Sequence, residues 1–172
     1  PWGERGYVAI DRVHGVLEAS THLRAVPQDA ARVQTGVSGD PALLWVGRLD
    51  ANKSPLTVLA GVERAAEALP GLTLSMLYTD APQLDAVRRR IEASTALRNR
   101  VRLIGAVPHA DMAAWFSAAD LFVSGSQEEA AGYAVIESCS CGVTPVATDI
   151  APFRAIAGAA GVGVLWTPRY AG

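Results

Sequence analysis

Two glutamates, Glu129 and Glu137, lie in one passage that directly follows the strand-like run of residues 121–123. A carboxylate accepts hydrogen bonds from hydroxyl groups. Small residues open a helix between the two glutamates, and the free amides of a helix N-terminus bind phosphate. A nucleotide sugar presents hydroxyls and phosphates together, so the passage predicts a site for a ligand of this chemistry.

The residues between the glutamates keep the start of this helix accessible. Ala130, Ala131 and Gly132 carry no bulky side chain. The first amides can therefore approach a phosphate closely, and the helix dipole favours an anion there. We expect Gly132, Tyr133 and Ala134 to contact the ligand.

The surroundings of Glu137 also favour a binding role. A helix glutamate most often faces solvent, but the residues around Glu137 are apolar on most sides, from Ala134 to Cys141. This pattern indicates a lined cleft. Glu128 competes with Glu129 for the position in the loop, and residue chemistry alone leaves both open.

A second polar loop follows the strand-like run of residues 43–46 and contains Gly47, Arg48 and Lys53. Two cations can offset the charge of a diphosphate without a metal, and Gly47 lets the loop turn tightly. The alternative is that both cations are solvated residues near the start of a helix. Cations are slightly unfavourable beside the positive end of a helix dipole, which favours the ligand role.

These loops need a framework, and the chain alternates strand-like and helix-like segments. The expected strands are residues 43–46, 72–77, 101–104, 121–123, 144–147 and 163–165, and the expected helices are residues 55–69, 82–93, 111–119 and the segment with Glu137. This alternation predicts a doubly wound α/β domain with a parallel sheet covered on both faces. Ligands bind beyond the carboxyl ends of such strands, so residues 47–53, residues 105–108 and the glutamate passage should open onto one crevice.

The domain organisation predicted from the sequence has two parts. Residues 1–38 are expected to be the tail of a preceding domain and a linker, with a strand-like run at residues 13–20, and residues 39–172 the ligand-binding domain. A boundary near Asp40 and Pro41 fits the polar, glycine-rich residues before it. Because the chain begins at Pro1 without a methionine, we expect it to be a fragment of a longer protein.

The composition excludes several classes of protein. The 172 residues are 50% hydrophobic, enough for one cored domain. The formal net charge is -2 and the 19% of charged residues contain no basic stripe, so we expect no nucleic-acid partner. The longest charge-free apolar stretch, residues 155–166, is interrupted by glycines and is shorter than the roughly 20 residues that span a bilayer.

The cysteines and histidines suggest no metal site. Cys139 and Cys141 are separated by one residue in a helix-like segment, so we expect reduced, cytosolic packing residues with no metal role. His14, His22 and His109 share no ligand spacing, and we expect isolated surface or linker residues.

Together these motifs resemble the carboxy-terminal, donor-binding half of GT-B glycosyltransferases of the family 4 type, the group 1 glycosyl transferases. The resemblance covers about residues 43–166. It rests on residues 46–49 with Lys53, residues 103–107, residues 118–123, residues 129–137, and residues 141–142 with 145–146. Five pieces in the family's order are a specific signal.

The resemblance implies a hexosyltransferase that retains anomeric configuration and uses a UDP-, GDP- or ADP-sugar, with no cofactor and no metal. It implies catalytic roles for Arg48 and Lys53 on the diphosphate and for Glu129 on the donor sugar, since Glu129 matches the first glutamate of the family's paired motif. Glu137 would bind the ribose. Gly105 and Val107, like Gly47, would lie in the donor site, with backbone atoms reading the base.

The resemblance further implies that the acceptor site and part of the catalytic constellation belong to an amino-terminal half that this chain lacks. We expect the fragment to bind donor nucleotide weakly and to transfer no sugar. The expected location is cytoplasmic, with membrane association through the missing part as an alternative. The expected pathway class is polysaccharide or glycoconjugate biosynthesis.

Some segments depart from the family's pattern. Ala130 and Ala131 stand where the family commonly has glycine, and residues 78–82 replace a glycine-bearing turn, so no ligand contact is assigned there. Residues 149–154 replace a glycine-rich loop; for Arg154 a solvated or structural role is favoured, and a phosphate contact is the alternative.

The alternatives are a nucleotide-sugar epimerase or phosphorylase of GT-B type, and a non-catalytic nucleotide-binding α/β module. A dinucleotide-binding module should carry Gly-x-Gly-x-x-Gly after its first strand, where this chain has residues 47–49. A receiver-like module needs an acidic cluster that the early strands lack.

Overall fold

The computed structural model describes residues 19–161 and 163–167. Its helices are α1 (Gln28–Thr35), α2 (Pro55–Ala65), α3 (Leu84–Glu92), α4 (Thr95–Arg98), the 3-10 turn η2 (His109–Asp111), α5 (Met112–Ala118), α6 (Tyr133–Ser140) and α7 (Ala151–Ala160). Its strands are β1 (Ala42–Gly47), β2 (Thr73–Tyr78), β3 (Val101–Gly105), β4 (Leu121–Ser124), β5 (Thr144–Thr148) and β6 (Val164–Trp166).

The strands form one parallel sheet in the order β3-β2-β1-β4-β5-β6. The chain runs outward from β1 in one direction through β2 and β3, then returns to the other side of β1 and continues through β4, β5 and β6. The predicted doubly wound α/β fold is confirmed. Because β1 pairs with both β2 and β4, the loops after β1 and β4 diverge at the switch point, where such sheets bind ligands.

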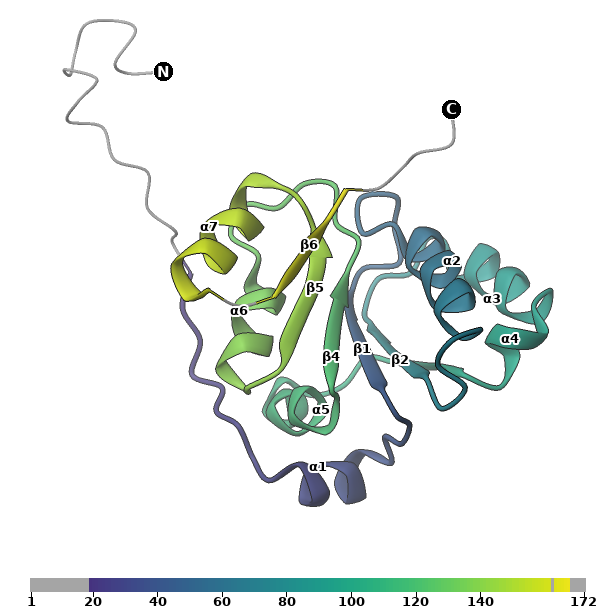
Figure 1. Cartoon of the computed structure of the whole chain (residues 1–172), viewed down its shortest axis with the longest axis horizontal. Helices are drawn as coiled ribbons and strands as arrows, with labels where there is room; N and C mark the ends of the chain where they lie inside the picture. Colours follow the sequence, from purple (N-terminus) through teal and green to yellow (C-terminus); the bar gives the residue numbers. More distant parts are fainter. Residues whose placement is uncertain (1–18, 162, 168–172) are drawn as a thin grey trace, which may run out of the picture.

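Helices cover the sheet on both faces, and each face has its own core (Figure 1). Along β1, Leu44 belongs to the core shared with α1, α5, α6 and α7, while Leu43 and Trp45 belong to the core shared with α2, α3 and α4. This is the alternation that a strand produces when both of its faces are buried. The strand segments therefore read as nearly continuous hydrophobic runs.

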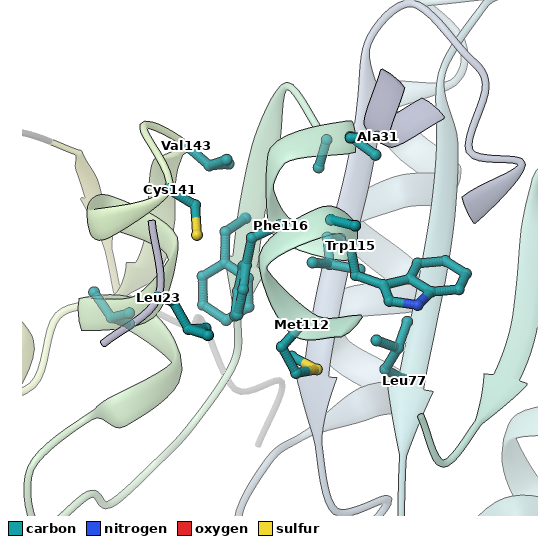
Figure 2. Packing of buried hydrophobic residues seen from close by; sticks show 14 of the residues in the cluster. Leu23, Ala31, Leu77, Met112, Trp115, Phe116, Cys141 and Val143 are labelled. Carbon is teal, nitrogen blue, oxygen red and sulfur yellow. The ribbon is translucent and has the colours of Figure 1, made fainter. Parts of the chain in front are cut away.

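Helix α5 is the centre of the first core (Figure 2). Phe116 is fully buried and contacts Phe122 of β4 edge to face, with ring centroids 5.7 Å apart. Met112 and Trp115 lie on the same helix and are also buried. The helix therefore packs its apolar residues against the sheet. Met112 also lies next to the candidate site, so α5 connects the core to the crevice.

Helix α1 packs against α5 and is attached to the sheet by Asp120. The Asp120 carboxylate accepts hydrogen bonds from Arg32 Nη2 at 2.9 Å and from the backbone N of Ala42 at 2.7 Å. Leu23 and Ala31 are buried in the same core. Residues 23–37 thus contact the body of the domain. The division at residue 38 stays a prediction, and most of the strand-like run at residues 13–20 lies outside the described residues.

Three helices are absent from the sequence-based expectation: α1, α4 and α7. Helix α4 is a single turn capped by Ser94, whose Oγ accepts a hydrogen bond from the backbone N of Leu97. Helix α7 occupies residues that the sequence suggests to be a loop. Pro152 lies in its first turn, where a missing N–H costs no helical hydrogen bond. Within residues 19–161 and 163–167, no helix is long and apolar enough to cross a bilayer.

Candidate functional site

The loops after β1 and β4 are joined by backbone and amide hydrogen bonds. The backbone N of Gln127 donates to the carbonyl O of Asn52 at 2.8 Å. Asn52 in turn donates through Nδ2 to the carbonyl of Glu128 at 3.0 Å and accepts from the backbone N of Glu128 at 2.9 Å. Two segments far apart in the sequence therefore form one rim of the crevice.

Ser54 and Gly125 allow these loops to approach so closely. Ser54 has a φ of 46° and is the non-glycine residue with positive φ among those described; its Oγ accepts a hydrogen bond from Gln127 Nε2 at 3.0 Å. A Cβ atom added at Gly125 would lie 3.0 Å from Val58 Cγ2 and 3.2 Å from the carbonyl O of Lys53. Tight local geometry of this kind concentrates at functional sites.

Lys53 and Glu129 face each other across the joined loops. The Lys53 Nζ forms an ion pair with Glu129 Oε1, and the two side chains are only 21% and 19% exposed. Ser126 Oγ donates to the same oxygen at 2.8 Å. Glu128, by contrast, is exposed. The structure therefore directs Glu129, not Glu128, toward the crevice.

Arg48 lies on the same rim but is bound to other carboxylates. Its Nη2 is 2.7 Å from Asp80 Oδ2, and its Nε is 3.4 Å from Asp50 Oδ2. Arg48 and Asp80 are both 59% exposed, so this contact is worth little and can exchange readily. Asp50 also accepts from the backbone N of Lys53 at 3.0 Å, which shapes the loop.

A cavity of about 230 Å³ opens at the carboxyl ends of β1, β2 and β3. Five residues of the predicted site line it: Gly47, Arg48, Lys53, Gly105 and Val107. The remaining wall is mainly apolar and includes Val46, Leu77 and Met112. Gly105 has a φ of 87° where the chain leaves β3, a conformation that favours glycine. The cavity thus combines an apolar wall with cations at its edge.

The end of β2 and the segment after it also line this cavity, although no feature of the sequence assigns these residues to the site. Tyr78 and Thr79 line the wall, and Asp80 binds Arg48. The backbone N of Leu49 also donates to the carbonyl O of Asp80 at 2.8 Å, so the two loops are joined. Only their position could have indicated this contribution from the sequence, because these residues lie at the carboxyl end of a strand that pairs with β1.

Helix α6 begins with Gly132, after the loop that carries Glu129. The predicted site residues of this loop and helix do not line the cavity: Glu129, Gly132, Tyr133, Ala134 and Glu137. Gly132 is the N-cap, has a φ of 69° and offers no side-chain cap. A Cβ atom there would lie 2.8 Å from Phe153 Cε1. Glycine is therefore required both by the backbone conformation and by the packing of α7, and Tyr133 and Ala134 follow it in the first turn.

Glu137 lies further along α6, and its side chain is only 15% exposed. Its Oε1 is 3.5 Å from His109 Nε2. The prediction that His109 is isolated is wrong, because the loop after β3 reaches α6. The sequence could not reveal this pair, since its members are far apart along the chain and belong to different elements.

The remaining polar and sulfur groups fit structural roles. Burial raises the pKa of the Cys139 and Cys141 thiols, and both cysteines are free. Arg154 binds both oxygens of Asp149, at 2.5 and 3.0 Å, and these hydrogen bonds lower the pKa of Asp149. In the described part of the chain, no group of three or more His, Cys, Asp or Glu side chains is placed to hold a metal ion.

Known proteins are similar to this chain in both sequence and fold. The chain is 32% identical over 133 residues to the D-inositol 3-phosphate glycosyltransferase of Thermobispora bispora, covering 73% of this chain and 31% of that protein. It is 28% identical over 123 residues to the GDP-mannose:cellobiosyl-diphosphopolyprenol alpha-mannosyltransferase of Xanthomonas oryzae pv. oryzae, covering 72% and 32%. The chain thus spans about a third of the length of these relatives.

Solved structures give the same result. Sucrose-phosphate synthase from Thermosynechococcus elongatus superposes with a TM-score of 0.70 at 29% identity, covering 86% of this chain and 37% of that one. HepE of Anabaena, solved in complex with UDP, superposes with a TM-score of 0.70 at 24% identity, covering 85% and 40%. The sequence model of the family described as "Glycosyl transferases group 1" matches residues 40–170. This chain, a Rossmann-like domain of the GT-B fold, therefore belongs to the group 1 glycosyl transferases.

Proposed function

We propose that this chain is the donor-binding half of a retaining glycosyltransferase that transfers a hexose from a nucleotide sugar to an acceptor. The observation that carries the proposal is the rim at the switch point, where Lys53 of one loop meets Glu129 of another beside the cavity. Lys53, a cation suited to phosphate, is thus in direct contact with Glu129, a carboxylate suited to hydroxyls.

Lys53 and Arg48 would bind the diphosphate. Both are paired with carboxylates, Lys53 with Glu129 and Arg48 with Asp80. A diphosphate offers more charge and more acceptor oxygens than a single carboxylate, so it can replace these partners. The first turn of α6, opened by Gly132, would supply amides to the same group.

The two glutamates would bind the sugars on either side of the diphosphate. Glu129 would accept hydrogen bonds from the hydroxyls of the donor hexose, and Glu137 from the ribose diol. The base would lie by the cavity wall near Gly47, Gly105 and Val107, where backbone atoms can read its edge. Cavities with apolar walls and few polar groups are typical of such ligands.

The chemical contribution of this half would be electrostatic. When the glycosidic bond breaks, negative charge develops on the leaving diphosphate, and preplaced cations stabilise it. No side chain of this chain need act as a nucleophile. The acceptor and the remaining catalytic groups would come from an amino-terminal half that closes over the donor. We therefore expect this chain alone to bind nucleotide weakly and to transfer no sugar.

The relatives differ in their nucleotide. The name of the Xanthomonas relative contains GDP-mannose, and the Anabaena structure contains UDP. The candidate donors for this chain are accordingly UDP-, GDP- and ADP-sugars. We propose a role in polysaccharide or glycoconjugate biosynthesis at the cytoplasmic side, and the division into a preceding tail at residues 1–38 and a donor domain at residues 39–172 belongs to the same proposal.

Calorimetric titration of the chain with UDP, GDP, ADP and their glucose or mannose conjugates tests the proposal. One nucleotide should bind, and Lys53→Ala and Glu137→Ala should each raise its dissociation constant by about ten-fold, as expected for loss of a charged hydrogen bond. Arg88→Ala removes an exposed cation of α3 and should leave binding unchanged. If the wild-type chain bound none of these nucleotides or nucleotide sugars, the donor-site assignment would be overturned.

A further inference from the structure

Ser126 is a buried polar residue in the loop after β4. It is 1% exposed, and its Oγ lies 2.8 Å from Glu129 Oε1 and 3.2 Å from Ser124 Oγ. Thr148 of β5 donates its Oγ1 to the carbonyl oxygen of Ser126. Contacts from two neighbouring strands therefore fix this residue, its backbone as well as its side chain.

This arrangement gives the Ser126 hydroxyl a defined direction. A hydroxyl has one proton to donate, and a carboxylate is the stronger acceptor, because hydrogen bonds to ionised groups are shorter and stronger than those between neutral groups. The proton therefore goes to Glu129, while Ser124 Oγ, 6% exposed, supplies the hydrogen bond behind it. Burying these hydroxyls costs free energy unless they form hydrogen bonds. Here the hydrogen bonds form a series from Ser124 through Ser126 to the carboxylate of Glu129.

Both contacts of Glu129 fall on the same oxygen. Oε1 accepts from Ser126 Oγ and is paired with Lys53 Nζ. Among the residues that the structure describes, neither contact involves Oε2, so this oxygen is available for a hydroxyl of a ligand. The geometry divides the carboxylate into an anchored oxygen and a binding oxygen.

Donor binding as proposed above would change this arrangement, and the present inference rests on that proposed function. When Lys53 turns to the diphosphate, Glu129 loses its cation while it remains largely buried. An unpaired carboxylate would then rotate toward the nearest donor or toward solvent. Ser126 is the contact that remains on Oε1.

We infer that Ser126 is a positioning residue that holds Glu129 in its sugar-binding orientation once Lys53 has moved to the phosphates. Ser126 therefore determines how strongly the site distinguishes a nucleotide sugar from the nucleotide diphosphate without a sugar. Its effect on binding of the diphosphate alone should be small, because the sugar is the part of the ligand that Glu129 would contact.

The test compares dissociation constants for UDP and UDP-glucose, GDP and GDP-mannose, and ADP and ADP-glucose, measured by calorimetry on the whole chain. With the pair that the wild type binds, the nucleotide sugar should bind more tightly than the diphosphate. Ser126→Ala should reduce that preference by about ten-fold, the effect of losing one hydrogen bond to a charged group, while the dissociation constant of the diphosphate changes less than about two-fold.

Three further variants keep the test decisive. Ser117→Ala removes another buried hydroxyl, on α5, which accepts from the backbone N of Val26 and does not contact Glu129; it should preserve the sugar preference. Ser126→Thr keeps the hydroxyl and should restore the preference where it folds. If Ser126→Ala does not fold, Thr148→Val, which removes the hydrogen bond to the Ser126 backbone, should lower the preference in the same direction.

The outcomes separate the two proposals. Failure of the wild type to bind any of the six ligands would overturn the proposed function. Binding of the diphosphates with no preference for their sugars, or a preference that survives Ser126→Ala, would overturn the role of Ser126 alone. A loss in Ser126→Ala that weakens the diphosphate and its sugar equally would show a general structural role and would also contradict the inference.

Discussion

Each charged residue of the candidate site is already paired with another side chain. Lys53 contacts Glu129, Arg48 contacts Asp80, and Glu137 lies 3.5 Å from His109. A ligand that binds here must therefore replace existing partners. At the exposed Arg48 this replacement is easy, since exposed ion pairs contribute little. Lys53 is largely buried, and replacing its partner by a phosphate would leave Glu129 without its cation. Ser126 would then be the remaining contact that holds Glu129.

A residue-scale prediction concerns Asp80. Asp80→Asn removes the carboxylate that competes with a diphosphate for Arg48. We expect the nucleotide diphosphate to bind about three-fold more tightly at low salt, with the gain shrinking as salt screens the exposed charges. Calorimetry at two salt concentrations measures this change.

The matched control is Asp85→Asn, which makes the same change of charge at an exposed position in the first turn of α3. It should leave the dissociation constant within about 1.5-fold, since Asp85 has no contact with Arg48 and exposed charges are screened. Weaker binding in Asp80→Asn would mean that Asp80 instead orients Arg48 for the ligand.

The elements around the site depend on a few backbone positions. Helix α6 can begin directly after the loop that carries Glu129 because Gly132 adopts the left-handed conformation, and α7 packs against it because Gly132 has no side chain. The loop after β4 passes close to α2 because Gly125 leaves room for Val58. At this scale the positions of Glu129 and Glu137 depend on where glycine allows the chain to turn.

Gly132→Ala tests this point. The added Cβ meets Phe153 Cε1 at 2.8 Å on a backbone with a φ of 69°. We expect a loss of about 1 to 3 kcal/mol in the free energy of unfolding, with weaker nucleotide binding because α6 is displaced. Urea denaturation followed by circular dichroism measures the first effect, and calorimetry the second.

Gly61→Ala is the control for this change. Gly61 lies inside α2, and a Cβ there meets no atom within 4 Å. The substitution should stabilise the chain by roughly 0.5 to 1 kcal/mol, because alanine has the higher helix propensity. Equal effects of the two substitutions would contradict the requirement for glycine at the start of α6.

At the scale of the whole molecule, helix α1 is joined to the sheet at the amino ends of the strands, opposite the candidate site. Asp120 precedes β4 and binds the first backbone N of β1 together with Arg32 and Gln28 of α1. The motif that contains Asp120 contributed to the family resemblance, yet this residue lies at the amino ends of the strands. Its contacts show a role in assembly of the domain.

Asp120→Ala should therefore destabilise the fold while leaving the site chemistry intact. It leaves the buried N–H of Ala42 without its acceptor. The side chains of Arg32 and Gln28 lose one acceptor each and keep the carbonyl oxygens of Ala118 and Ala119. We expect the free energy of unfolding to fall by about 1 to 3 kcal/mol, the cost of an unsatisfied buried group, and faster hydrogen exchange in α1. Denaturant titration and hydrogen exchange measure these effects.

Asp29→Asn in the exposed first turn of α1 serves as the comparison. Because it loses only an interaction with the helix dipole, its effect should stay below about 1 kcal/mol. If Asp120→Ala were as mild as this control, the attachment of α1 through Asp120 would be of little importance to the fold.

The sheet and several residues of the candidate cavity were predictable from the amino-acid sequence alone. Short apolar strands separated by helices predicted a parallel doubly wound sheet, and strand-end positions predicted that residues 47–53 and 105–108 would meet. The structure confirms the fold, and Gly47, Arg48, Lys53, Gly105 and Val107 line one cavity. Such features are local, because periodicity and turn residues are set by neighbours along the chain.

The contacts between side chains became known from the three-dimensional structure. The pairing of Lys53 with Glu129, the contribution of Tyr78 and Thr79 to the cavity, and the approach of His109 to Glu137 all depend on segments that are far apart in the sequence. Ser126 contacts Glu129 within one loop, but the backbone of that loop is held by Thr148 of β5. Helices α1 and α7 likewise form because they pack against α5 and α6. Sequence spacing carries little information about contacts between loops, because their distances depend on how the strands are ordered and packed.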